Sequence, residues 1–318
     1  MQLELVNDPS TGRYLRLVSA SQKHPASANR LTTSSTMLHP VKPNAEPAPP
    51  VVPSGEGSAL VEEMLTIGVV PNISANLLQA HYEHLRRYLE RTGNGQKVRI
   101  VIPANFKAFF DGALRGDYDL SIAAPNLARV AQLDRGLAPL LNFEPRIAAN
   151  LVTLREGGVT TPRDIQGKRL AFANPQSLVA MYGQQWLSAE LRLEANRDYE
   201  VKAARTDLGV GRMMLTGEAD AAIMSQGEFR SLPADEATRM RIVEVFARVP
   251  NFIVLAHPRI VQDQTNRLRV RLKDFLKDAT DGAAFARATG LTGIVDVDQA
   301  TLRELDAFVP ATRKAMGY

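Results

Sequence analysis

The chain has 318 residues, which is long enough for two domains, because single domains commonly comprise about 100 to 200 residues. Its apolar fraction of 45% and charged fraction of 23% are typical of globular proteins and exclude fibrous and wholly disordered chains. The net charge is +4, and Lys and Arg are not gathered into dense clusters interleaved with aromatic residues, so we expect no nucleic-acid partner.

The absence of cysteine excludes disulfides, thiolate metal sites and cysteine nucleophiles. No apolar run reaches the roughly 18 residues that a membrane-spanning helix needs. Residues 1–60 contain no apolar stretch typical of a signal peptide. If the protein is exported, we expect the sequence to begin after its export signal or at a misassigned start.

Residues 1–60 are expected to form a disordered or tag-like tail. Residues 21–58 are rich in Ser, Thr, Pro and Ala and lack a periodic apolar pattern. Before them, Leu3 and Leu5, and then Leu15 and Leu17, alternate on either side of a turn-forming segment at 7–12. This pattern predicts a β-hairpin, although two strands alone are marginally stable.

From residue 64 onward, strand and helix patterns alternate. Residues 65–70 form an apolar run, and Ser74 precedes a helix with apolar residues at helical spacing up to Gly93. Residues 98–102 predict a strand, 105–114 a helix and 118–123 another strand. Repeated β-α-β units indicate a parallel sheet that is covered by helices on both faces, with its ligand site at the carboxyl ends of the strands.

A second block repeats the alternation, with a strand at 169–173, a helix at 176–193, a strand at 199–205, a helix opened by Asp207 and a strand at 219–224. Extended segments at 147–154 and 242–255 connect the two blocks. We therefore predict an α/β fold of two Rossmann-like lobes joined by a two-segment hinge. The first lobe comprises 61–151 and 251–318, where the C-terminal helices pack back on it, and the second comprises 152–250.

Four predicted strand-to-helix junctions would converge on one site, at residues 71–74, 124–126, 174–177 and 205–207. Helix N-termini present free N–H groups and a positive dipole end, and therefore bind anions. The candidate side chains at these junctions are Asn72, Ser74, Asn126, Gln176, Ser177 and Arg205. Ser74, Asn126 and Asp207 are also common helix N-cap residue types, so a purely structural role is an alternative for each.

Five sequence segments occur in an unbroken order, namely LTIGVVP at 65–71, GDYDL at 116–120, AAP at 123–125, DIQGKRLAF at 164–172 and GEADAA at 217–222. Their order resembles that in the periplasmic phosphate-, phosphite- and phosphonate-binding proteins of ABC transporters. The resemblance covers about residues 64 to 278 and implies a type II periplasmic-binding fold. It also implies that the lobes close around a ligand, which is then delivered to a membrane permease.

The resemblance matches Asp220 to a carboxylate that accepts a hydrogen bond from the ligand, although an exposed turn residue is equally compatible with the sequence. Ser225 follows the same strand and would face the site. At 177–180 this chain has SLVA where phosphonate-binding relatives have Ser-Thr-Ser-Gly, and Arg205 lies near the position of a ligand-binding His. The apolar replacements predict a solute with a nonpolar side beside its anionic group.

Together these patterns predict a solute-binding protein of an ABC importer that closes around a small anionic solute of the phosphonate or phosphate-like class. The ligand-binding candidates are Asn72, Ser74, Asn126, Gln176, Ser177, Tyr182, Arg205, Asp220 and Ser225, although core packing is an alternative for Tyr182.

Two other functions are compatible with the same fold. One is a ligand sensor that signals to a membrane receptor kinase, and the other is an enzyme, although the junctions offer few acid-base groups. We expect no catalytic activity, no cofactor and a periplasmic monomer. We also expect no metal, because His81 and His84 are three residues apart on a helix without an acidic partner nearby in sequence.

Overall fold

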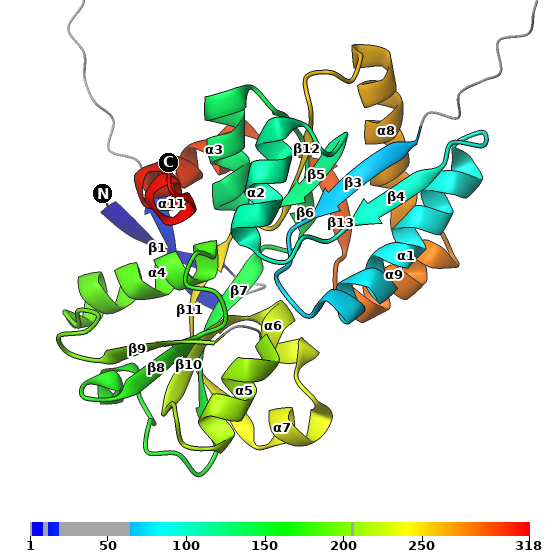
Figure 1. Ribbon diagram of the computed structural model, residues 1–318. Helices are drawn as coiled ribbons and strands as arrows, with labels where there is room; N and C mark the ends of the chain where they lie inside the picture. Colours follow the sequence, from blue (N-terminus) through cyan, green and yellow to red (C-terminus); the bar gives the residue numbers. More distant parts are fainter. Residues whose placement is uncertain (1, 9–11, 19–63, 205–206) are drawn as a thin grey trace, which may run out of the picture. The chain divides into compact units, whose positions relative to one another are not determined.

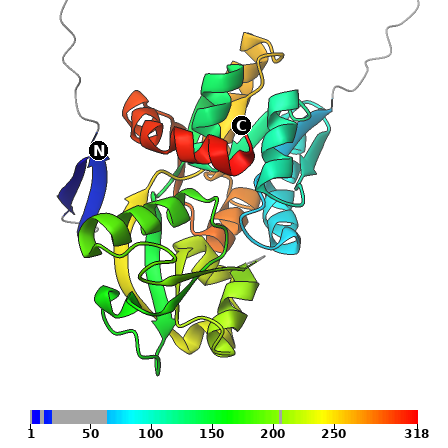
Figure 2. The same ribbon diagram turned by 60° about the vertical axis from the view of Figure 1, so that its left-hand side comes forward.

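The computed structural model describes residues 2–8, 12–18, 64–204 and 207–318, without the side chains of 2–18 and of residues 207 and 208. Two mixed β-sheets with helices on their faces confirm the predicted α/β fold of two lobes (Figures 1 and 2). Within the described ranges, no helix is both long and apolar enough to cross a lipid bilayer.

The six-stranded sheet forms the first lobe. Its strands lie in the order β13 (Gly293–Asp296), β6 (Ala138–Glu144), β12 (Ile253–Ala256), β5 (Leu120–Ala123), β3 (Leu65–Val69) and β4 (Val98–Val101). The predicted parallel pairing holds for β5, β3 and β4, whereas β12, β6 and β13 pair antiparallel.

The seven-stranded sheet forms the second lobe. Its order is β1 (Gln2–Asp8), β2 (Gly12–Val18), β11 (Met240–Val249), β7 (Ile147–Leu154), β10 (Ala221–Ser225), β8 (Arg169–Phe172) and β9 (Glu200–Ala203). The predicted hairpin is present as β1 and β2, and β2 lies parallel to β11. Part of the segment that the sequence set apart as a tail thus extends this sheet, whereas 19–63 lies outside the described residues.

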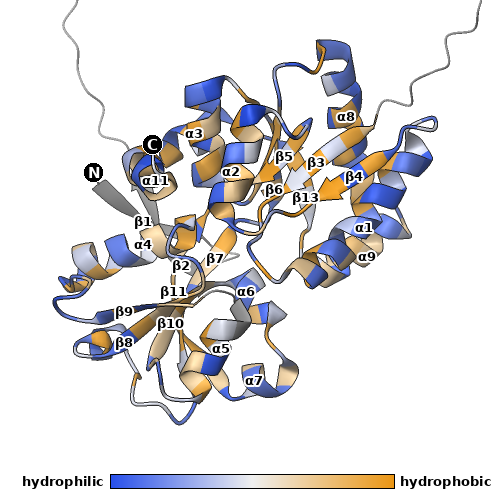
Figure 3. Ribbon diagram, viewed as in Figure 1, coloured by the Kyte–Doolittle hydropathy of each residue, from blue (hydrophilic) through white to orange (hydrophobic). Residues whose placement is uncertain are grey.

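Helices cover both faces of the first sheet, in which every residue of β3 and β5 is buried, and Figure 3 shows mainly hydrophobic colours along β5. One face packs against α1 (Ala75–Thr92), α8 (Gln262–Phe275) and α9 (Asp281–Thr289). The other face packs against α2 (Phe106–Arg115) and α3 (Pro125–Arg135). The α2 helix begins where the Asn105 side chain accepts a hydrogen bond from the Ala108 N–H, and it ends at Gly116, whose φ of 83° suits glycine.

The second sheet is covered in the same way. One face packs against α4 (Leu178–Trp186), which continues as a π-helical turn at Leu187–Leu191. The other face packs against α5 (Asp207–Leu215), α6 (Gln226–Ser231) and α7 (Ala234–Thr238). A short 3-10 helix at Pro162–Ile165 precedes β8.

The C-terminal segment comprises α10 (Gln299–Glu304), a 3-10 turn (Leu305–Phe308) and α11 (Val309–Met316). It was expected to pack on the first lobe, and α11 does lie against α3. Phe308 also packs against Tyr182 of α4, with 4.5 Å between the ring centroids. The segment therefore contacts both lobes, and its apolar residues join a core that includes residues from both sheets.

Two segments connect the lobes, as the sequence predicted. The chain leaves β6 at Glu144 and enters β7 at Ile147, and it returns between Val249 and Ile253. The Asn251 Nδ2 donates to the Pro145 carbonyl at 2.6 Å, and the Arg146 Nε donates to the Arg248 carbonyl at 2.9 Å. These bonds join the two segments to each other where they pass from one lobe to the other.

Asp281 links α9 to α1. Its carboxylate is almost fully buried and accepts hydrogen bonds from Arg87 at 2.8 Å and from Arg91 at 2.7 Å, with His84 also 3.4 Å away. Burial alone would raise the pKa of Asp281, but the hydrogen bonds from Arg91, Arg87 and His84 hold it below its ordinary value.

We expect Asp281→Asn to lower the free energy of unfolding by about 1–3 kcal/mol near neutral pH, because charge-assisted hydrogen bonds to a buried carboxylate are lost. A lowered pKa in the folded state stabilises the protein above the unfolded pKa, and this contribution is lost as the pH falls through the folded pKa. The difference in the free energy of unfolding between the wild type and the variant should therefore shrink below about pH 4. Urea unfolding of both proteins at several pH values measures this difference.

Asp263→Asn is the matched control, because Asp263 is exposed in the first turn of α8. It should change stability by less than about 0.5 kcal/mol, as most surface substitutions do. Equal stability of the wild type and Asp281→Asn at neutral pH would contradict the assigned role of Asp281.

Candidate functional site

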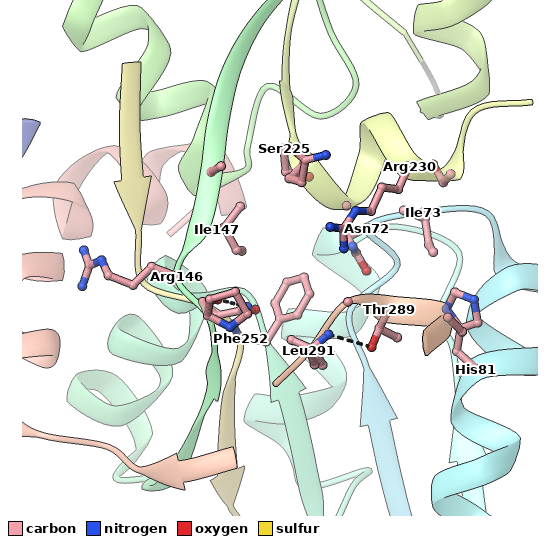
Figure 4. Close-up of a pocket in the computed structure, with 18 of the residues that line it drawn as sticks. Asn72, Ile73, His81, Arg146, Ile147, Ser225, Arg230, Phe252, Thr289 and Leu291 are labelled. Atoms are coloured by element: carbon pink, nitrogen blue, oxygen red, sulfur yellow. Dashed lines mark hydrogen bonds between the residues drawn. The ribbon is translucent and has the colours of Figure 1, made fainter. Parts of the chain in front are cut away.

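A pocket of about 540 Å³ lies where the crossing segments meet helices of both lobes (Figure 4). The crossing segments contribute 145–148 and part of 248–252. The first lobe contributes residues of α1 and of the end of α9, and the second lobe contributes residues along the whole of α6. Lining residues thus come from segments that are far apart in sequence. A pocket between two hinged lobes can enclose a small molecule when the lobes close.

The charges in the pocket all have one sign. Arg146, Arg230 and Arg248 line it together with His81, and no Asp or Glu is among the lining residues. Arg146 donates to Glu304 Oε1 at 2.6 Å, so its charge is compensated by a carboxylate outside the pocket. Among the described residues, the guanidinium groups of Arg230 and Arg248 form no hydrogen bond or ion pair. Two guanidinium groups therefore remain available to an anion.

Arg230 extends from α6 toward the first lobe and lies beside Asn72 (Figure 4). Its guanidinium also lies against the backbone of Gly290 at the end of α9, and a Cβ atom built at Gly290 would be 1.6 Å from Nη1. Only a glycine leaves room for Arg230 in this position, and the φ of 76° at Gly290 also suits glycine.

Several other polar side chains in the pocket are already occupied by local hydrogen bonds. Asn251 bonds to Pro145 and to the N–H of Phe252, and Thr289 bonds to the Phe285 carbonyl and the Leu291 N–H. Ser225 caps α6 through the Glu228 N–H. Asn72 and Gln226 have side chains without a hydrogen bond within the described part of the chain, and they therefore remain available to a ligand.

The rest of the lining is largely apolar. Its members are Ile73, Leu77, Leu78, Tyr82, Ile147, Val245, Phe252 and Leu291. Figure 4 shows Phe252 between the hinge side of the pocket and Leu291. The pocket therefore combines cationic groups with a hydrophobic wall.

His81 does not add a full charge at neutral pH. Burial, together with the nearby His84, lowers the pKa of His81 below its ordinary value of 6.5. The ring is thus neutral at pH 7 and offers one hydrogen-bond donor and one acceptor.

The structure brings two of the nine predicted residues, Asn72 and Ser225, into the pocket lining. Ser74 precedes α1 as its N-cap residue but forms no side-chain capping bond. Arg205 lies outside the described residues. Asp220 lies at the opposite end of β10 from Ser225, where it pairs with Arg169 at 2.9 Å and accepts a hydrogen bond from the Arg169 N–H.

Four further predicted residues meet at a second location, next to the C-terminal segment. Asn126 is 1% exposed, and its Nδ2 donates to the Gln176 carbonyl and to Thr312 Oγ1, both at 3.1 Å. Gln176 Nε2 donates to the Ala315 carbonyl at 3.0 Å. Ser177 caps α4 through the Ala180 N–H. Here the side chains of Asn126 and Gln176 bind α11.

Tyr182 belongs to the same group. Its hydroxyl donates to Glu304 Oε1 at 2.9 Å, the same oxygen that pairs with Arg146. Burial, followed by the charge and hydrogen bond of Glu304, strongly raises the pKa of Tyr182, which therefore remains a neutral donor. Tyr182 thus contributes to the contact between α4 and the C-terminal segment.

The sequence analysis did not select the cationic residues of the pocket. Arg146 and Arg248 lie in or beside the predicted crossing segments, and Arg230 lies just after a predicted strand. The sequence could have pointed to Arg146 and Arg248, because hinge segments of a two-lobed fold border the ligand site. His81 was considered only as a metal ligand.

No curated protein sequence matches this chain. Among solved structures, a binding-protein component of an ABC phosphonate transporter from Pseudomonas aeruginosa is similar, with a TM-score of 0.69, 12% identity, and coverage of 80% of this chain and 88% of that one. PhnD1 from Prochlorococcus marinus, in complex with methylphosphonate, has a TM-score of 0.69, 10% identity, and coverage of 80% and 99%.

The XAC2383 protein from Xanthomonas citri, bound to ATP, has a TM-score of 0.62, 21% identity, and coverage of 79% of this chain and 98% of that one. These likenesses show the type II periplasmic-binding fold. The family model described as "ABC transporter, phosphonate, periplasmic substrate-binding protein" matches residues 67–302. Because this match spans well over half of the chain, the protein belongs to the family of periplasmic substrate-binding proteins of ABC phosphonate transporters.

Proposed function

We propose that this protein binds a small anionic solute of the phosphonate or phosphate-like class in the pocket between its lobes and delivers it to an ABC permease from the periplasm. The observation that carries the proposal is the charge of the pocket, which is lined by three arginines and by no carboxylate. Guanidinium groups bind phosphonate oxygens bidentately, through charge-assisted hydrogen bonds.

The same lining supports binding without chemical turnover. A general acid-base mechanism needs positioned titratable groups, and the pocket offers His81 and Tyr82 but no Asp, Glu, Lys or Cys. Its polar groups are suited to hold an anion. The two crossing segments support a hinge motion, since each passes directly from one sheet to the other over a few residues.

Anionic phosphorus compounds should raise the melting temperature of the protein, because a ligand that binds only the native state stabilises it by RT ln(1 + [L]/Kd). The panel contains phosphate, methylphosphonate and phenylphosphonate. The matched control is dimethyl methylphosphonate, an uncharged ester that should produce no shift. If none of the three anions raised the melting temperature at millimolar concentration, the proposed ligand class would be wrong.

Arg230→Gln and Arg248→Gln should each weaken binding of the best anion about 10-fold to 100-fold, because each removes a charge-assisted contact that contributes about 1.5–3 kcal/mol. Isothermal titration calorimetry measures the dissociation constant of the anion for each variant. Arg163→Gln is the control, because Arg163 is an exposed residue that does not line the pocket. Unchanged affinity in both pocket variants would place the anion site elsewhere.

Deletion of the gene tests the transport role. In the organism that encodes the chain, the deletion should abolish uptake of the radiolabelled anion that the calorimetry identifies, and expression of the wild-type gene should restore it. Normal uptake in the deletion strain, with the transporter genes expressed from a constitutive promoter, would favour a sensor role instead.

A further inference from the structure

We propose that the solute is a phosphonate with a bulky apolar substituent, about the size of an aromatic ring, rather than an ion as small as methylphosphonate. This inference rests on the proposed function and specifies the substrate of the same pocket.

The pocket is large for a small oxyanion. Its volume of about 540 Å³ falls within the range of roughly 300–1,000 Å³ that encloses drug-sized ligands. A methylphosphonate ion would fill only a small part of this space and would leave the apolar walls wet, so its binding would gain little from the hydrophobic effect.

Apolar side chains line the pocket and remain partly accessible to solvent. Ile73 and Leu77 border it from the first lobe, and Ile147 and Val245 border it from β7 and β11. Each of the four is intermediate in burial, whereas the apolar residues of the adjoining cores are buried. A substituent that covers these side chains would remove apolar surface from water and thereby strengthen binding.

Phe252 is held so that its ring can contact such a substituent. The Phe252 N–H donates to Asn251 Oδ1 at 2.7 Å, and its carbonyl accepts from the Phe143 N–H at 3.0 Å. Both bonds fix the backbone at the crossing segment, and the ring lies inside the pocket between the hinge and Leu291 (Figure 4). An aromatic ring in this position can stack on a planar substituent.

The arginine side chains of the pocket would bind the anionic end of the solute. Arg230 and Arg248 have no partner within the described residues, and Asn72 lies beside Arg230 with its side-chain amide available. Arginine side chains without a carboxylate partner favour a headgroup that carries more negative charge, such as a phosphonate dianion. The pocket therefore fits an anionic headgroup at Arg230 and an apolar body toward Phe252.

Isothermal titration calorimetry with the full chain tests this inference, with phenylphosphonate, methylphosphonate and benzenesulfonate as the probes. We expect phenylphosphonate to bind at least about 10-fold more tightly than methylphosphonate, because the ring buries additional apolar surface. We expect benzenesulfonate, which has the same ring and a single negative charge, to bind more weakly than phenylphosphonate.

Phe252→Ala should reduce the ratio of the phenylphosphonate and methylphosphonate affinities about 10-fold. Leu133→Ala is the control, because Leu133 is 49% exposed on α3 and does not line the pocket, and it should leave the ratio unchanged. Circular dichroism and melting temperature show whether each variant is folded. Phe252→Leu is a second variant that keeps the volume closer to that of Phe, and it should lower the ratio by a smaller factor.

The outcomes separate this inference from the proposed function. If methylphosphonate bound as tightly as phenylphosphonate, the bulky-substituent inference would be wrong and the proposed function would stand. Equal affinity for benzenesulfonate and phenylphosphonate would overturn the requirement for a dianion. If none of the anions bound, the proposed function itself would fail.

Discussion

The antiparallel pairing of the two crossing segments is the constraint on which the pocket depends. β6 pairs with β12 in one sheet, and β7 pairs with β11 in the other, so the two crossing segments run side by side. The hydrogen bonds from Asn251 to Pro145 and from Arg146 to Arg248 join them where they change sheets. The crossing segments thus form one border of the pocket, and Phe252 and Arg248 of these segments line it.

The electrostatics of the protein follow from where the carboxylates lie. Elsewhere in the fold, many arginines pair with acidic residues, as Arg87 and Arg91 do with Asp281 and as Arg169 does with Asp220. The pocket lining contains no carboxylate, so Arg230 and Arg248 keep their charge available. The modest net charge of +4 does not reveal this local field, because attraction of an anion depends on the charges near the site.

One group of predicted ligand residues has hydrogen-bond partners in the C-terminal segment. Helix N-termini such as that of α4 offer free N–H groups, and nearby polar side chains can complete an anion site. In this protein Thr312 and Ala315 of α11 accept hydrogen bonds from Asn126 and Gln176, and Glu304 accepts one from Tyr182. The same side chains that suggested ligand contacts therefore link the lobes to the end of the chain.

The sequence by itself determined the order of strands and helices, the two lobes and the two crossing segments, because each of these leaves a local pattern of apolar spacing and turn residues. Asn72 and Ser225, which line the pocket, could be placed at one end of their sheets for the same reason, since each follows a recognisable strand. Only the tertiary structure decided which cations share the pocket, because Arg146 and Arg248 come together through the pairing of β7 with β11, and Arg230 reaches the pocket from α6. Local periodicity encodes which face of a strand is buried, whereas the partners across a sheet and the docking of α11 depend on the packed fold.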